Sequence, residues 1–135
     1  MNPLHILLVE DNEGDILLTT ETLEETNLSK KISIARDGLE AITLLDSYSF
    51  NNQDLPDLVL LDINLPKING FAVLEHIKKT NTLSHIPVII LTTSGSPADK
   101  IMANELKTSN YLIKPAEIED FVIAISKIES LGNLG

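Results

Sequence analysis

The sequence predicts an α/β fold: a doubly wound parallel sheet of five strands with helices on both faces. Two observations predict this class. Short runs that are almost entirely apolar, as at residues 5–9, 58–61 and 87–91, are typical of strands buried on both faces. Each run is followed by a segment whose apolar residues recur with helical spacing, and strand and helix alternate five times. Crossovers between parallel strands are right-handed, which places helices on both faces.

The elements can be assigned in order along the chain. After the first strand, Asp11 or Asn12 can cap a helix whose apolar face we expect to include Leu17. The polar segment 47–57 is expected to be a surface connection, and Pro97 suits the first position of the fourth helix. The predicted strands are 5–9, 31–35, 58–61, 87–91 and 111–113. Apolar residues at helical spacing mark the helices within 16–28, 39–45, 71–77 and 118–128, and one more helix starts at Pro97.

Length and composition limit the possible functions. A chain of 135 residues fits one domain, so we expect residues 1–135 to form a single domain with no effector domain. The formal net charge of −10 repels nucleic-acid phosphates and anionic lipids, which argues against binding to nucleic acid or membrane. The absence of cysteine excludes disulfides and thiolate metal sites. With no apparent signal peptide or membrane span, we expect a cytoplasmic location.

Charged and hydroxyl side chains follow the predicted strands at the points where they end. Glu10 and Asp11 follow the first strand, Asp62 the third, Thr92 the fourth and Lys114 the fifth. The carboxyl ends of parallel strands meet at one edge of the sheet, where ligands bind in such folds. Each residue alone has an ordinary explanation as a helix-start acid, a turn former or a solvated lysine. Their joint position at four strand ends favours a functional site.

Three clustered carboxylates require a cation beside them. At an effective dielectric of ~20, two like charges ~4 Å apart repel by about 4 kcal/mol, and Lys114 supplies only one positive charge. An all-oxygen ligand set favours Mg2+. We expect Asp11 and Asp62 to be direct ligands and Glu10 to act through water, with carboxylate pKa values raised by mutual repulsion.

This set of groups suits phosphoryl transfer to a carboxylate. Asp62 can attack phosphorus and form an aspartyl phosphate, while Mg2+, Lys114 and Thr92 each take one phosphoryl oxygen. The histidines show no comparable pattern, and we assign no role to them: His5, His76 and His85.

Five motifs are specific in combination: Leu-Leu-Val-Glu10-Asp11-Asn12, Leu-Leu-Asp62-Ile-Asn64-Leu-Pro66, Asn69-Gly70, Leu91-Thr92-Thr93 and Tyr111-Leu-Ile-Lys114-Pro115. They resemble the receiver domain of two-component response regulators, and the match covers residues 4–128. The resemblance implies a flavodoxin-like (βα)5 fold with strand order 2-1-3-4-5. It implies that Asp62 is the phosphoacceptor, and that Glu10, Asp11 and the Asn64 backbone carbonyl complete a site for Mg2+, or Mn2+ in its place.

The resemblance also implies a switch. Thr92 is then the switch hydroxyl, Lys114 the phosphate-binding lysine, and Tyr111 the aromatic residue that turns inward on activation. The peptide bond between Lys114 and Pro115 is expected to be cis.

The implied partners are a histidine kinase or phosphotransfer protein, which donates the phosphoryl group, and an unknown downstream protein that is contacted after phosphorylation. A homodimer is also possible. The long connection 47–57 and the sequence of residues 106–110 are similar to stand-alone receivers that partner phytochrome histidine kinases.

Two other functions compete with this one. A haloacid dehalogenase-like aspartyl phosphatase wants a second aspartate two residues after the nucleophile, where this chain has Asn64, which cannot take a proton at neutral pH. A pseudo-receiver would bind a partner without phosphorylation, yet every charged group of the site is present. We therefore expect a signalling phosphoacceptor and not a turnover enzyme.

Overall fold

Five parallel strands form one sheet in the order β2-β1-β3-β4-β5, as expected. The structure is a computed structural model and describes residues 3–28 and 30–128. The strands are β1 (Leu4–Val9), β2 (Lys30–Ala35), β3 (Leu58–Leu61), β4 (Val88–Thr92) and β5 (Asn110–Ile113). The helices are α1 (Glu13–Glu24), α2 (Gly38–Asn51), α3 (Gly70–Lys79), α4 (Pro97–Glu105) and α5 (Ile118–Ser126).

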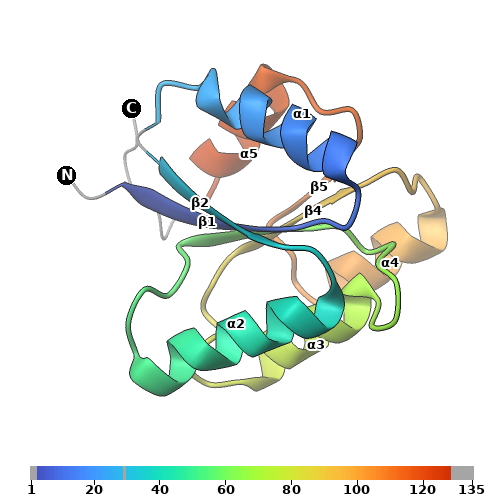
Figure 1. Cartoon of the computed structure of the whole chain (residues 1–135). Helices are drawn as coiled ribbons and strands as arrows, with labels where there is room; N and C mark the ends of the chain where they lie inside the picture. Colours follow the sequence, from blue (N-terminus) through green and yellow to red (C-terminus); the bar gives the residue numbers. More distant parts are fainter. Residues whose placement is uncertain (1–2, 29, 129–135) are drawn as a thin grey trace.

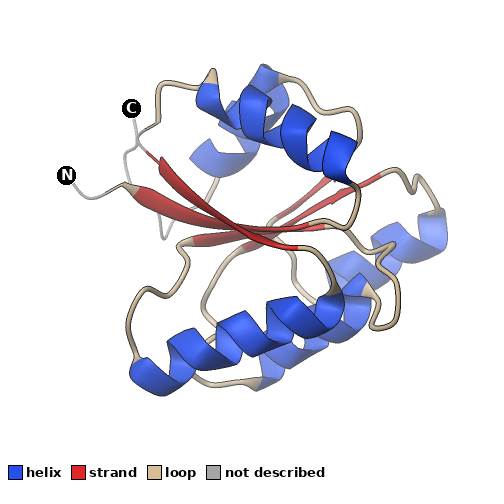
Figure 2. Cartoon of the chain, viewed as in Figure 1, coloured by secondary structure: helices blue, strands red, loops and turns tan. Residues whose placement is uncertain are grey.

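The helices cover both faces of the sheet. In Figure 1, α1 and α5 lie on one face, while α2, α3 and α4 lie on the other. Figure 2 shows the same three layers by secondary structure, with the strands in the middle. Each face has its own hydrophobic core, and alternate residues of the buried strands contribute to the two cores. The central strand β3 is buried along its whole length, as its apolar run predicts.

The first helix begins as predicted but buries a different face. The Asn12 side chain accepts a hydrogen bond from the backbone N–H of Asp15, so Asn12 is the cap. Leu17, however, is 58% exposed, and the expectation that it packs in the core is wrong. The helical phase set by Ile16 and Leu23, which are buried, turns Leu17 toward solvent.

The second helix is longer than predicted. It extends to Asn51, so the first part of the expected surface connection 47–57 is helical. The ring of Tyr48 packs edge-on against His5, with 5.6 Å between ring centroids, and this contact anchors the last turns. Most residues in the last part of α2 are polar and face solvent, and this polar composition is the reason why a loop was predicted there. Asn52, whose backbone is left-handed, caps the end of the helix.

The remaining boundaries lie within a few residues of expectation, although α1 ends at Glu24 and does not reach Leu28. Pro97 begins α4 at its first turn. The closing helix ends at Ser126 and not at Ile128, although Ile128 is still buried against the sheet. The peptide bond between Lys114 and Pro115 is cis. Within the described ranges, no helix has the length and apolar character needed to cross a membrane.

Candidate functional site

Three charged residues each lie one position beyond the end of a strand and extend its hydrogen-bond ladder. The backbone N–H of Glu10 donates to a carbonyl of β2 at 3.0 Å, and that of Asp62 donates to the last carbonyl of β1 at 3.1 Å. The N–H of Lys114 donates to the last carbonyl of β4 at 2.8 Å. The sheet itself therefore fixes where these three side chains start, at the carboxyl ends of the strands.

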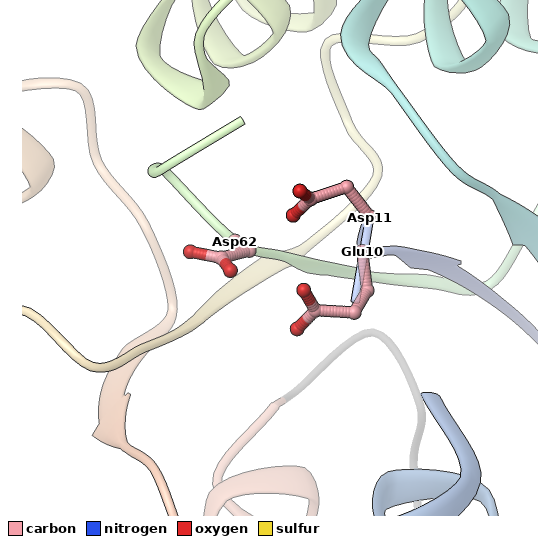
Figure 3. A group of neighbouring side chains, drawn as sticks. All are labelled: Glu10, Asp11 and Asp62. Carbon is pink, nitrogen blue, oxygen red and sulfur yellow. The ribbon is translucent and has the colours of Figure 1, made fainter. Parts of the chain in front are cut away.

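The acidic residues from β1 and β3 meet above this edge. Glu10, Asp11 and Asp62 each offer a carboxylate oxygen, and these oxygens lie within 4.8 Å of one another. Figure 3 shows the Glu10 and Asp11 side chains projecting toward the same space as Asp62. Glu10 and Asp62 are buried, whereas Asp11 is exposed. Three convergent oxygen donors of net negative charge fit a hard divalent cation such as Mg2+.

The ammonium group of Lys114 lies among three carboxylates. Its Nζ donates to Glu10, to Asp62 Oδ2 at 3.0 Å and to Asp15 Oδ2 at 2.9 Å. The strand-end positions predict that Glu10 and Asp62 lie near this lysine, but they do not predict its contact with Asp15. Asp15 lies in the first turn of α1, where an acidic residue is ordinarily explained by its favourable interaction with the helix dipole. Its position in the sequence therefore gave no reason to expect a contact with Lys114.

Burial and charge shift the pKa values of the site. Burial is the largest cause that raises the pKa of Glu10 to about 7; the negative charge of Asp62 adds to it, and the hydrogen bond from Lys114 opposes it. We had expected mutual repulsion to be the main cause, but for Glu10, which is 1% exposed, desolvation is larger. Burial acts to lower the pKa of Lys114, yet its hydrogen bonds to the three carboxylates outweigh burial and raise the pKa.

Thr92 and Asn64 are placed beside Asp62 by hydrogen bonds. The backbone N–H of Asn64 donates to Asp62 Oδ1 at 3.0 Å, and the Asn64 side-chain amide donates to Thr92 Oγ1 at 3.2 Å. The N–H of Ser94 also donates to Thr92 Oγ1, at 3.3 Å. Thr92 is completely buried. The threonine hydroxyl is therefore linked both to the loop after β3 and to the loop after β4.

Tyr111 connects β5 to the loop between β4 and α4. Its hydroxyl donates to the carbonyl of Ser94 at 2.7 Å, and the Ser94 hydroxyl donates to Asp99 Oδ2 at 2.6 Å. Burial raises the pKa of the Tyr111 hydroxyl, and the negative charge of Asp99 adds to this effect. These contacts form a continuous chain from Thr92 through Ser94 to Tyr111 and to the first turn of α4.

Two glycines allow close packing around the loop that follows Asp62. A Cβ atom on Gly70 would collide with the backbone of Asp62 and Ile63, and one on Gly38 would collide with the carbonyl and side chain of Ile68. The N–H of Gly70 donates to the carbonyl of Ile63 at 3.0 Å. The first turns of α2 and α3 therefore lie directly against this loop and hold the Asp62 backbone in place.

The fold and this arrangement of acids, threonine and lysine are those of a receiver domain, and the chain belongs to the response regulator receiver domain family. The family model matches residues 6–126. The expected family, the expected strand order and the signalling class are thereby confirmed.

The chain is similar to several response regulators in particular. It is 40% identical over 129 residues to the response regulator Rcp1 of Synechocystis sp., covering 95% of this chain and 88% of Rcp1. The bacteriophytochrome response regulator AtBRR has a TM-score of 0.86 at 38% identity, and the match covers 100% of this chain and 99% of AtBRR. These neighbours confirm the resemblance to receivers of the phytochrome type.

Two further solved structures match with similar identity. The phosphorylated cyanobacterial phytochrome response regulator RcpA has a TM-score of 0.79 at 38% identity, covering 93% of this chain and 91% of RcpA. The Mn2+-bound form of Rcp1 has a TM-score of 0.77 at 40% identity, covering 95% of this chain and 93% of that one.

Proposed function

We propose that this receiver domain accepts a phosphoryl group on Asp62 and signals through contacts that depend on phosphorylation. The observation that carries the proposal is the set of charged groups around the Asp62 carboxylate. Asp62 Oδ2 accepts a hydrogen bond from Lys114, and one Asp62 oxygen lies within 4.8 Å of one oxygen each of Glu10 and Asp11. An Asp62 that served only to start a loop would need neither a buried ammonium nor two further acids.

Glu10, Asp11 and Asp62 would hold Mg2+ or Mn2+, together with the backbone carbonyl of Asn64. The all-oxygen donor set and its excess of negative charge support this assignment. When bound, the cation would neutralise negative charge between the attacking carboxylate and the incoming phosphoryl group. A divalent cation is also present in the structure of the similar protein Rcp1, which was solved in an Mn2+-bound form.

The transfer step uses residues of this chain in distinct roles. An Asp62 oxygen forms a bond to phosphorus as the bond from phosphorus to the phosphohistidine nitrogen breaks, and the electron pair leaves with the imidazole. Lys114 and Thr92 each donate a hydrogen bond to a phosphoryl oxygen. Attack by water in line with the Asp62 oxygen later removes the group and restores the carboxylate.

The signal passes through the loop after β4. The phosphoryl oxygen draws the Thr92 hydroxyl toward Asp62, which breaks its hydrogen bonds from Asn64 and Ser94 and changes the space available to Tyr111. Because Tyr111 is bonded to the Ser94 carbonyl, the surface of α4 and β5 changes with it. A histidine kinase or phosphotransfer protein donates the group, and the similarity to phytochrome response regulators favours a phytochrome kinase.

The proposal can be tested with beryllofluoride, which mimics a phosphoryl group on a carboxylate. The wild-type chain is titrated with beryllofluoride with and without Mg2+, and binding is followed through backbone amide NMR signals. We expect binding only with Mg2+, and none in Asp62→Asn. Incubation with acetyl phosphate and Mg2+ should add the mass of one phosphoryl group to the wild-type chain but not to this variant.

Asp54→Asn is the matched control, since it makes the same change at an exposed aspartate in the loop before β3. Its backbone is left-handed, a conformation that asparagine also adopts readily. This control should bind beryllofluoride like the wild type. Binding that persists in Asp62→Asn, or that needs no cation, would contradict the proposed function.

A further inference from the structure

We propose that Asp15 is a positioning residue of the site: its carboxylate holds Lys114 and sets the balance between cation binding and phosphoryl binding. The inference rests on the function proposed above and deepens it. Asp15 lies outside the acidic cluster of Glu10, Asp11 and Asp62, and it comes from α1, not from a strand end.

The donors of Lys114 are fully used. An ammonium group has three N–H donors, and Lys114 Nζ contacts a carboxylate with each: Glu10, Asp15 and Asp62. A phosphoryl oxygen can bind this lysine only by replacing one of these contacts. The Asp62 contact is the one replaced, because Asp62 itself carries the phosphoryl group. Glu10 and Asp15 then remain to orient the ammonium.

Asp15 differs from the other two acids in its surroundings. Glu10 and Asp62 would share their charge with a bound cation, whereas Asp15 does not belong to that cluster and has Lys114 as its partner. Its side chain is 34% exposed, against 1% for Glu10. Asp15 and Lys114 line a hollow of about 360 Å³ together with Thr19, Thr93 and Glu117, so water can reach this carboxylate.

The charge of Asp15 affects a cation and a phosphoryl group in opposite ways. The four carboxylates and one ammonium leave an excess of three negative charges, counting Glu10, Asp11, Asp15 and Asp62 against Lys114. The Asp15 charge attracts a divalent cation to the site. It also neutralises part of the Lys114 charge and repels the oxygens of a phosphoryl group. Its removal should therefore weaken cation binding and tighten phosphoryl binding.

The test measures both affinities in the same chains. Mg2+ is titrated into wild type and Asp15→Asn by calorimetry, and beryllofluoride is then titrated at saturating Mg2+ with amide NMR signals as the readout. We expect Mg2+ to bind Asp15→Asn about fivefold more weakly and beryllofluoride to bind it about fivefold more tightly. A loss of packing or folding would weaken both, so the opposite signs identify the electrostatic role.

Two further variants separate position from charge. Asp15→Glu keeps the charge and should restore both affinities to within about twofold of the wild type. Glu13→Gln removes one charge from the same helical turn, where Glu13 pairs with Arg36 at 2.5 Å, and it should also stay within about twofold.

The outcomes distinguish the two proposals. A wild-type chain that binds beryllofluoride, with Asp15→Asn affinities that are unchanged or that shift in the same direction, overturns the role of Asp15 alone. Equal shifts in Glu13→Gln and Asp15→Asn overturn it as well, since the effect would then belong to the helix as a whole. A wild-type chain that does not bind beryllofluoride with Mg2+ overturns both the proposed function and this inference.

Discussion

Glu10 is expected to destabilise the fold when it ionises, and Glu10→Gln should remove this effect. The pKa of Glu10 is raised from 4.5 to about 7, mainly because the side chain is buried. A carboxyl group with a raised pKa binds its proton more tightly in the folded state. Its stabilising contribution is therefore present below pH 4.5 and is lost as the pH rises through about 7.

The magnitude follows from the size of the shift. One pKa unit corresponds to about 1.4 kcal/mol, so the full change is on the order of 3 kcal/mol, most of it between pH 5 and pH 8. Lys114 adds no slope in this range, because its raised pKa keeps it protonated in both states. Relative to Glu10→Gln, the wild type should lose roughly 2 to 3 kcal/mol of unfolding free energy from pH 5 to pH 8.

The assay is urea unfolding with a chelator present, at several pH values across this range. At each pH the unfolding free energy of Glu10→Gln is subtracted from that of the wild type. The change of this difference with pH is free of any pH-independent effect of the substitution, such as a weakened hydrogen bond to Lys114. Glu21→Gln is the control: it removes an exposed carboxylate of α1 and shows how the loss of a surface acid alone changes the pH dependence of the unfolding free energy. Parallel stability curves for wild type and Glu10→Gln would refute the reasoning, because burial would then not perturb the ionisation of Glu10.

Three further predictions concern the same site. Mg2+ competes with the Glu10 proton, so wild-type Mg2+ affinity should rise roughly tenfold from pH 6 to pH 8 in calorimetric titrations, and a flat profile would contradict the raised pKa. Gly70→Ala should lower the unfolding free energy by about 1–3 kcal/mol in urea, because its Cβ would meet the Asp62 backbone, whereas Gly95→Ala, whose Cβ would lie 3.7 Å from Ile113, should be nearly neutral. Tyr111→Phe should lower it by about 0.5–1.5 kcal/mol through loss of the bond to the Ser94 carbonyl; an unchanged urea midpoint would argue against that contact.

The fold could be predicted because its strands are buried on both faces and therefore read as continuous apolar runs. The run 58–61 identified β3, and the alternation of elements then fixed the rest of the sheet. The end of α2 could not be predicted, because the residues after Leu45 do not continue the apolar pattern: Phe50 is 90% exposed and the others are mostly polar. Leu17 was predicted on the buried face together with its neighbour Ile16. Adjacent helix positions are rotated by about 100°, so Leu17 turns away from the face that Ile16 and Leu23 bury.

The site was partly predictable for a similar reason. Strand ends place Glu10, Asp62 and Lys114 by topology, so their convergence follows from the order of the sheet. The contact of Lys114 with Asp15 joins residues 99 positions apart and depends on how α1 lies over the edge of the sheet. Sequence spacing carries no information on that placement. The dominant cause of the Glu10 pKa shift was also missed, because side-chain burial depends on the packed structure.

The close contact of Gly38 and Gly70 with the loop after β3 has a consequence for how a signal can leave the site. At Gly70 backbone packs on backbone, so this contact offers no side chain that could rotate to accommodate a new group on Asp62. The opposite wall, at Thr92 and Ser94, is joined by single hydrogen bonds of 3.2 and 3.3 Å, which exchange at little cost. If Asp62 accepts a phosphoryl group as proposed, we expect the resulting movement to be directed toward α4, with the two glycines determining that route together with Thr92.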